Sequence, residues 1–416
     1  MRSMKGGRAA ASTPETLSPR ALVQSLRIAL LVNPFTLKRR GAGHPSELAR
    51  ELLGRGHTVR GFGAPLGHIP RSGSEPRVEG GVAPEDGMGI QGFKPDVILA
   101  YDALSPAAWL GARRARSSGA ALVLVEEGFP DQGRPFERFL RSVGKRLWGA
   151  FVRRTTDRLV ASDAAAISQV QRLGFPEAIL EEVYGGVDLV SCRPGLSSHL
   201  FTEHGIRGRT LLTIGRLEES RGIDLLIRAF AETVGRRDDW SLVLAGRGSA
   251  KPSLRALADR LGVGSRVHWL GTPRREERAG LMGSATLLAL PATDEDVGSL
   301  TVRQALACGL PVLASDLPRL RSYVDDDGTG LLIEPGDPGA WVDAIRIAAG
   351  APVRRERWRQ RARAVAEERF SWPSIAERFE GIMLEALAQR ELLASLKDSK
   401  TETPAAPEGL GASGDG

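Results

Sequence analysis

The chain has 416 residues, which is enough for two domains of ordinary size. Its composition, 42% hydrophobic and 26% charged, excludes a disordered chain, and no apolar stretch approaches the roughly 18 residues that span a membrane. A net charge of +7 fits nucleic acid, acidic lipid or an anionic substrate, but 5% aromatic residues and no helix-turn-helix, RNA-recognition or zinc-finger pattern argue against nucleic acid as a partner.

The cysteines and the N-terminal segment indicate a reducing compartment. Two cysteines far apart in sequence, Cys192 and Cys308, exclude a disulfide scaffold and a cysteine-rich zinc module. We expect Cys308 to be a small buried residue. Residues 1–25 are polar and lack an apolar centre, so they carry no signal peptide pattern and are expected to be disordered. These features predict a cytoplasmic location.

The first half of the chain alternates between strands and helices. Residues 64–92 are rich in glycine and proline and are predicted to form a long loop. Helices are predicted around Leu48 to Leu53, near 106–116 and before Gly174. Strands are predicted at 25–32, 97–100, 121–125 and 158–161, with another that begins at Thr58.

The second half repeats this alternation after residues 189–208, a segment with a weaker pattern that contains proline and several glycines. A last helix after Trp372 is predicted to carry its apolar side chains on one face, and the tail beyond about 395 to be disordered. Alternation at this spacing predicts parallel sheets with helices on both faces and ligands at the carboxyl ends of the strands. Strands are predicted at 210–214, 241–245, 266–270, 286–290 and 312–314, and helices near 222–235, 252–262, 275–283 and 300–308.

Two cations follow the strand at 210–214. Arg216 stands in the sequence Gly-Arg-Leu, and Arg221 precedes a glycine. Arginine offers a planar fork that suits bidentate contacts with phosphate, so the pair is suited to a diphosphate. On charge alone, both arginines could equally be solvated surface charges.

A helix start further along the chain supports the same chemistry. Ser299 is a candidate N-cap, and Gly309 is predicted to lie just past the end of this helix, with Pro311 preventing its continuation. A helix N-terminus binds anions through its free amides, here those of Leu300, Thr301 and Val302.

These residues resemble the donor-binding half of family 4 glycosyltransferases. That family has the GT-B fold, an α/β architecture of two Rossmann-like, doubly wound domains that face each other across a cleft. Its pattern is Gly-Arg-Leu, three residues, Lys-Gly, and later Glu-Gly-Phe-Gly, four residues, Glu-Ala-x-Ala-x-Gly-x-Pro-Val. The first part is kept here with Arg221 in the lysine position, and the second is kept from Ala305 to Val312. The resemblance covers residues 26–390 and is looser in the first half.

The resemblance implies a division of the chain into functional segments. The nucleotide-sugar-binding domain follows a linker, and a C-terminal helix crosses back to brace the first domain. The implied boundaries are 1–25 for a disordered segment, 26–188 for the acceptor-binding domain, 189–208 for the linker, 209–370 for the donor domain, 371–395 for the crossing helix and 396–416 for a disordered tail.

Two departures from the family pattern concern charged residues. In the family one glutamate contacts the donor sugar and a second contacts the nucleotide ribose; here Gln304 takes the second position, and Glu295 or Asp296 the first. Gln304 can still bind a hydroxyl, without charge assistance. Glu127 takes the position of a histidine after the fourth strand, where it suits a base toward an acceptor hydroxyl or a structural role. A solvated acidic turn is the alternative for Glu295 and Asp296.

Glycines mark the remaining expected donor contacts. By the resemblance, Gly41 and Gly43 lie in a loop close to the donor phosphate, where a side chain would obstruct. Gly246 and Gly271 are expected to border the nucleotide, although a tight turn explains Gly246 as well. The expected reaction retains anomeric configuration and needs no cofactor or divalent metal, because Arg216 and Arg221 stabilise the leaving diphosphate.

The acceptor is predicted to be a glycan or a lipid-linked molecule. Residues 134–154 contain seven basic residues and one acidic residue, with apolar side chains at helical spacing. Such a helix can contact the anionic inner face of a membrane. The alternative is that its apolar face packs on the sheet and its arginines are solvated.

Three functions therefore remain open. The first is an active glycosyltransferase in cell-surface glycan or polysaccharide synthesis, with a nucleotide sugar as donor. The second is a catalytically impaired relative that binds a nucleotide sugar or a partner, suggested by Gln304 and Glu127. The third is a dinucleotide-dependent α/β enzyme, disfavoured because no Gly-x-Gly-x-x-Gly follows the first strand.

Overall fold

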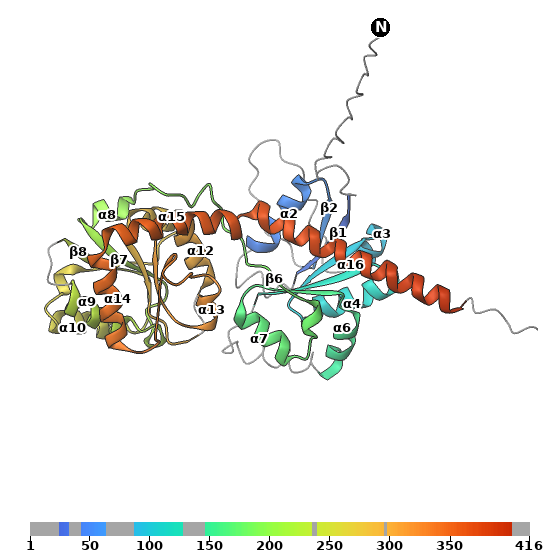
Figure 1. The fold of residues 1–416 in the computed structure, drawn as a ribbon, viewed down its shortest axis with the longest axis horizontal. Helices are drawn as coiled ribbons and strands as arrows, with labels where there is room; N and C mark the ends of the chain where they lie inside the picture. Colours follow the sequence, from blue (N-terminus) through green and yellow to red (C-terminus); the bar gives the residue numbers. More distant parts are fainter. Residues whose placement is uncertain are drawn as a thin grey trace, which may run out of the picture.

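The computed structural model describes residues 25–32, 43–63, 87–127, 146–234, 239–294 and 298–401. These residues form two lobes, each built on a parallel sheet of six strands (Figure 1). The predicted α/β architecture of two doubly wound domains is confirmed. Within the described ranges, no helix combines the length and apolarity needed to cross a membrane.

The first sheet has the strand order β2-β1-β3-β4-β5-β6, and every neighbouring pair is parallel. Its central strands are buried on both faces, as expected of a parallel sheet covered by helices. The strands are β1 (Arg27–Val32), β2 (Thr58–Gly63), β3 (Val97–Tyr101), β4 (Ala121–Glu126), β5 (Arg158–Ala161) and β6 (Leu180–Glu182).

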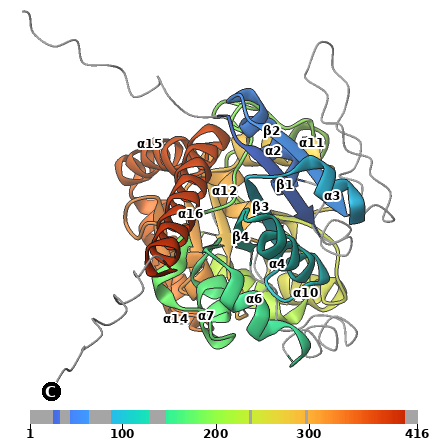
Figure 2. The ribbon, with the colours of Figure 1, turned by 90° about the vertical axis from the view of Figure 1, so that its right-hand side faces the viewer.

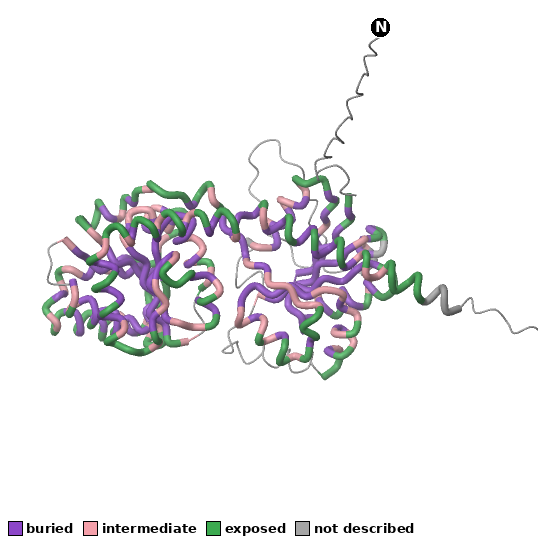
Figure 3. Tube along the Cα trace, viewed as in Figure 1, coloured by how far each residue is buried: buried purple, intermediate pink, exposed green. Residues whose placement is uncertain are grey.

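Successive residues of β1 face opposite sides of this sheet. Ile28 and Leu30 pack with the helices of one face, while Ala29 and Leu31 pack with those of the other. Helices α2 (Gly43–Gly54) and α16 (Trp372–Thr401) cover the first face. Figure 2 shows α16 and α4 on opposite sides of β3 and β4, and Figure 3 shows the buried strands inside both lobes. The second face is covered by α3 (Gly87–Phe93), α4 (Pro106–Ser118), α6 (Gly149–Thr155) and α7 (Ala164–Arg172).

Helix α3 corrects the predicted loop at 64–92. Residues 87–93 are helical because Ile90 and Phe93 have an apolar surface to bury, and Phe93 packs against Phe62 with ring centroids 5.9 Å apart. The rest of that segment, 64–86, lies outside the described residues. Residues 134–145 of the predicted basic helix lie outside them too; its end forms α6, whose Val152 is fully buried.

The second sheet has the strand order β12-β11-β10-β7-β8-β9. Read from β9 to β12, with β7 counted as the first strand of this lobe, the order is 3-2-1-4-5-6, which is that of a doubly wound fold. The direction of the strand order reverses between the first and the fourth strand. That reversal falls between β7 and β10. The strands are β7 (Arg209–Ile214), β8 (Trp240–Ala245), β9 (Val267–Leu270), β10 (Leu287–Leu290), β11 (Val312–Ser315) and β12 (Gly330–Ile333).

Helices cover both faces of this sheet as well. One face packs against α11 and α12, and the other against α9, α10 and α14. Strand β12 and helices α14 and α15 are not among the elements predicted from the sequence. The helices are α9 (Ile223–Thr233), α10 (Lys251–Arg260), α11 (Arg275–Ser284), α12 (Ser299–Ala307), α13 (Pro318–Arg321), α14 (Pro338–Gly350) and α15 (Pro352–Arg369).

The chain crosses between the lobes twice, at adjacent places. The Val187 amide donates to the Phe370 carbonyl oxygen at 2.8 Å, and Val187 pairs with Ser371 as an isolated bridge. Gly186 lies so close to Trp372 that an added Cβ would be 2.4 Å from the indole ring. After the first crossing, residues 189–208 include α8 (His199–Glu203), and Phe201 packs in the core of the second lobe.

Helix α16 runs from the second crossing along the first lobe (Figure 1). Phe379 is fully buried against that sheet. The buried carboxylate of Glu380 accepts a hydrogen bond from Arg55 Nε at 2.9 Å, and its other oxygen lies 3.0 Å from His57 Nε2. The helix continues through Thr401, which corrects the predicted start of a disordered tail at 396. The helix continues because residues 382–401 contain neither glycine nor proline and include many good helix formers.

Candidate functional site

A cleft of about 1320 Å³ lies where the carboxyl ends of both sheets meet. Tyr101 ends β3 and Glu127 follows β4 in the first lobe, while Arg216 follows β7 and Pro291 follows β10 in the second. The cleft therefore opens beside the reversal of strand order in the second sheet, where doubly wound folds place their ligands.

The two predicted cations line the second-lobe wall of this cleft. Arg216 is exposed, whereas Arg221 is half-buried and lies 3.7 Å from Asp294 Oδ1. Gly222, which follows Arg221, has a positive φ of 60°. An added Cβ at this position would lie 2.0 Å from the Pro291 carbonyl oxygen, so there is no room for a side chain. Only glycine adopts this conformation readily, which explains why a glycine follows Arg221.

The first turn of α12 lines the same cleft through Ser299, Leu300 and Thr301. The predicted N-cap at Ser299 is wrong: Gly298 is the N-cap in extended conformation, and no side chain caps the helix. The Thr301 amide donates to the Gly298 carbonyl oxygen at 3.0 Å, which tightens the first turn. The amides of Ser299 and Leu300 are thus the ones without an intrahelical acceptor.

The end of α12 agrees with the sequence. Gly309 has φ of 66°, its amide donates to the Leu306 carbonyl oxygen at 2.9 Å, and the Leu310 amide donates to that of Ala305 at 2.8 Å. This is the Schellman arrangement that favours glycine. Cys308 is buried as predicted.

Two of the other predicted donor contacts do not line the cleft. Gly246 and Gly271 are absent from the cleft lining, although Pro273 belongs to it. Gly246 packs on backbone, since an added Cβ would be 1.7 Å from the Gly215 carbonyl oxygen. Gly43 is the first residue of α2. Three of the predicted site residues, Gly41, Glu295 and Asp296, lie outside the described residues.

The first lobe contributes a polar cluster around Glu127. His44 Nδ1 lies 3.3 Å from Glu127 Oε1 and 3.1 Å from the Tyr101 hydroxyl. Burial, and after it the charge of Glu127, raises the pKa of Tyr101 well above its ordinary value, so this hydroxyl keeps its proton. The His44 ring also meets Trp372 edge to face, with centroids 5.2 Å apart. The sequence prediction missed His44, which lies 83 positions from Glu127 and carries no motif of its own.

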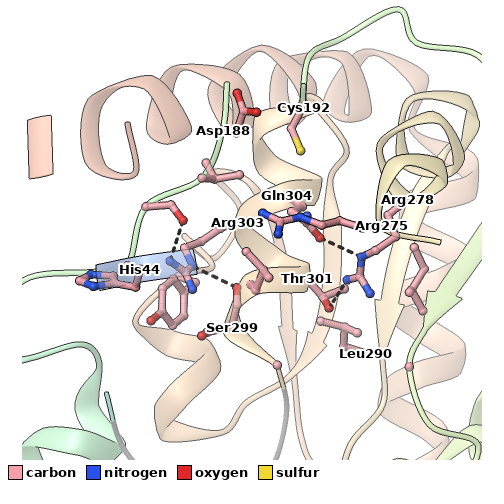
Figure 4. A pocket seen from close by; sticks show the side chains of 18 of the residues that line it. His44, Asp188, Cys192, Arg275, Arg278, Leu290, Ser299, Thr301, Arg303 and Gln304 are labelled. Carbon is pink, nitrogen blue, oxygen red and sulfur yellow. Dashed lines mark hydrogen bonds between the residues drawn. The ribbon is translucent and has the colours of Figure 1, made fainter. Parts of the chain in front are cut away.

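Further arginines missed by the sequence prediction line the cleft (Figure 4). Arg303 Nη1 donates to the Gly186 carbonyl oxygen at 3.0 Å, which joins α12 to the first crossing. Arg278 on α11 donates from Nε to Gln304 Oε1 at 3.0 Å and from Nη2 to Thr301 Oγ1 at 2.9 Å. Arg275, at the start of α11, and Arg319, in α13, also line the cleft.

Two acidic residues of the cleft have opposite pKa shifts. Burial raises the pKa of Glu47, against the opposing charge of Arg50. Burial would also raise the pKa of Asp188, but hydrogen bonds from the side chain and amide of Ser191 outweigh it and lower the value. Asp188 therefore stays ionised, at the point where the chain leaves the first lobe.

The lobes also touch beside the cleft. Tyr323 donates its hydroxyl to the Ser162 carbonyl oxygen at 3.0 Å, and Arg319 Nε lies 3.4 Å from Asp163 Oδ2. Both pairs join α7 and its preceding loop to the α13 region. Among the residues that the structure describes, no group of three or more histidine, cysteine, aspartate or glutamate side chains is arranged to hold a metal ion.

Comparison with known proteins finds similarity to glycosyltransferases. Residues 201–365 match the family model described as glycosyl transferases group 1. D-inositol 3-phosphate glycosyltransferase of Mycobacterium tuberculosis is 33% identical over 246 residues, which are 57% of this chain and 50% of the relative. The chain thus spans about half the length of the curated relatives it matches.

Two solved structures share the fold. HepE of Anabaena, in complex with UDP, aligns with a TM-score of 0.64 and 20% identity over 85% of this chain and 98% of that chain. A glycosyltransferase of Rickettsia africae aligns with a TM-score of 0.66 and 14% identity over 88% and 99%. These likenesses confirm the predicted GT-B arrangement of two α/β lobes about a cleft.

Proposed function

We propose, from the match of residues 201–365 to the family model described as glycosyl transferases group 1, that the chain moves a sugar from a nucleoside diphosphate donor to an acceptor hydroxyl. The observation that carries the proposal is the placement of Arg216, Arg221 and the first turn of α12 around one cleft, beside the reversal of strand order. Cations and helix amides together suit a diphosphate.

The proposed chemistry uses the second lobe to stabilise the leaving group. As the bond between the sugar and the diphosphate breaks, negative charge grows on the phosphate oxygens. Arg216, Arg221 and the amides of Ser299 and Leu300 then lie where preorganised charge and dipoles act on that oxyanion. We propose that these groups make a divalent metal unnecessary.

The first lobe is proposed to receive the acceptor. Glu127 borders the cleft from the first lobe and is assigned the role of accepting the proton of the acceptor hydroxyl, which, for retention, attacks on the face from which the diphosphate leaves. His44, 3.3 Å from it and packed on Trp372, would hold this carboxylate in place. By the family resemblance we expect the product to keep the anomeric configuration of the donor, which NMR of the product can determine.

We further propose a lipid-linked acceptor, used in the synthesis of a cell-surface glycan. Leu147 is 74% exposed, and Trp109 is 37% exposed with its ring 6.3 Å from that of Trp148. Arg113 lies over the Trp109 ring at 5.7 Å, and Arg146 is exposed nearby in sequence. Apolar and basic side chains together suit an anionic membrane surface.

A vesicle experiment tests this surface. We expect the protein to bind vesicles containing phosphatidylglycerol and not vesicles of phosphatidylcholine alone, and Leu147→Glu to weaken that binding about tenfold. Val353→Glu is the matched control, because Val353 is 84% exposed on the other lobe. Equal binding by both variants and the unaltered protein would remove the membrane proposal and leave the transferase proposal intact.

Calorimetry tests the function itself. UDP, GDP and ADP are titrated into the protein with EDTA present, and NAD is the comparison. We expect one nucleoside diphosphate to bind and its sugar nucleotide to be turned over with membrane extract as acceptor. Binding without turnover would support the catalytically impaired relative that the Gln304 departure suggests, and binding of NAD alone would end the proposal.

A further inference from the structure

Gln304 has a partner that fixes which end of its amide meets a ligand. Arg278 Nε donates to Gln304 Oε1 at 3.0 Å. An arginine side chain has no acceptor, so only the amide oxygen of Gln304 can face it. The Gln304 amino group, which has two donor hydrogens, is therefore the end left for the cleft that Gln304 lines.

Thr301 is oriented by the same guanidinium. Arg278 Nη2 donates to Thr301 Oγ1 at 2.9 Å, one helical turn before Gln304 on α12. With a lone pair of its oxygen occupied, the Thr301 hydroxyl can direct its hydrogen to a ligand. Figure 4 shows Arg278 reaching both side chains across the gap between α11 and α12.

Arg278 itself is held firmly in this place. The side chain is largely buried, and burial lowers its pKa from the usual arginine value, which nevertheless leaves it protonated at neutral pH. It also lines the cleft, so its remaining N–H groups add further donors to those of Gln304 and Thr301. Arg278, Gln304 and Thr301 thus all have hydrogen-bond donors available to the cleft.

We infer that this corner of the cleft binds the ribose of the donor with reversed polarity: Arg278 orients Gln304 and Thr301 so that both donate to the ribose hydroxyls, which would instead donate to a carboxylate at the Gln304 position. The inference rests on the proposed function, since it concerns the nucleotide of that donor. In the family resembled, a glutamate at the Gln304 position accepts from the ribose. In this chain the bond from Arg278 turns the amide oxygen of Gln304 toward α11 and leaves the amino group for the ligand, so the ribose hydroxyls serve as acceptors.

Fluorinated nucleotides distinguish the two polarities. Fluorine in place of a hydroxyl cannot donate a hydrogen bond and is repelled by a carboxylate, whereas it still accepts weakly from a donor group, so a site of donors loses only part of one hydrogen bond. Calorimetry compares UDP with 2′-fluoro-UDP and 3′-fluoro-UDP, or the matching GDP or ADP series if that diphosphate is the one bound. For the unaltered protein we expect each analogue to bind within about threefold of the parent.

A double variant replaces the hydrogen-bond donor at position 304 with an acceptor in the same fold. Gln304→Glu combined with Arg278→Met places a carboxylate there without its arginine, and the fluorinated analogue at the contacted position is expected to bind at least tenfold more weakly than the parent. Gln304→Glu alone serves as the second variant if the double variant does not fold. One oxygen of that glutamate can pair with Arg278 while the other meets the ligand, so the fluorinated analogue is again expected to bind more weakly than the parent.

Each outcome decides the matter. A loss of tenfold or more for the unaltered protein means that the ribose donates, and overturns the inference. Equal discrimination by the unaltered protein and the double variant means that Gln304 does not meet the ribose, and overturns it too. If no nucleoside diphosphate binds the unaltered protein, the proposed function has failed instead, and thermal melting of each protein shows whether a lack of binding reflects unfolding.

Discussion

Replacing Arg216 with alanine should slow sugar transfer without unfolding the protein. Arg216 is exposed on the cleft wall, so its removal leaves the buried core of the second lobe unchanged. Two unit charges about 4 Å apart interact by about 4 kcal/mol at an effective dielectric constant of about 20. Loss of one donor to a developing oxyanion typically costs about 2.7–4 kcal/mol, or about 10²–10³ in rate.

The neighbouring cation places Arg216→Ala at the lower end of that range. Arg221 remains in the variant and still faces the diphosphate, so we expect kcat/KM to fall about 10²-fold. Arg221→Ala should cost more, because it leaves Asp294, now 3.7 Å from Arg221, as an unneutralised negative charge beside the phosphates. Release of nucleoside diphosphate from the sugar nucleotide is the assay.

Arg247→Ala is the matched control for this measurement. Arg247 is an exposed arginine on the loop after β8, near the same sheet edge but absent from the cleft lining. Its activity should stay within about twofold of the unaltered protein. If Arg216→Ala retained more than a third of the activity, the assignment of this wall to the leaving group would be wrong.

Two further predictions concern the frame that holds the cleft. Glu380→Ala should lower the free energy of unfolding by about 2 kcal/mol or more, because the buried His57 and the Arg55 guanidinium lose their carboxylate; urea unfolding measures it, and a change below about 0.5 kcal/mol would contradict the reasoning. Gly222→Ala should weaken nucleoside diphosphate binding at least tenfold, because a Cβ 2.0 Å from the Pro291 carbonyl oxygen forces the Arg221 loop to shift, and calorimetry that gives unchanged affinity would disprove that account.

The elements that local pattern alone determines were predictable from the sequence. The buried strand Arg158–Ala161 has the predicted bounds, and the end of α12 follows from Gly309 because a left-handed residue there favours glycine. Ser299 was misplaced by one residue, since the tightened first turn moves the cap to Gly298. Strand β12 begins at Gly330, directly after Gly328 and Thr329, and glycine weakens the signal for a strand.

The contacts that build the site were beyond such reasoning. His44 and Glu127 meet only because α2 and β4 pack in one lobe, and no spacing along the chain encodes that approach. Arg278 is one of several arginines at the start of α11, and only the packing of α11 on α12 singles it out. Function-bearing pairs of this kind depend on tertiary structure, not on local propensity.

The paired crossings at Val187 and Phe370 have a mechanical consequence. Because the two peptide segments are bonded side by side, they form a single narrow ribbon, and relative rotation of the lobes is easiest about an axis through it. Arg303, which binds the Gly186 carbonyl oxygen, lies beside that axis and would scarcely be displaced, whereas side chains far from it would sweep through a wide arc. Opening the cleft by such a rotation would therefore move Arg221 away from Glu127, while the hydrogen bond between Val187 and Phe370 at the axis stays in place.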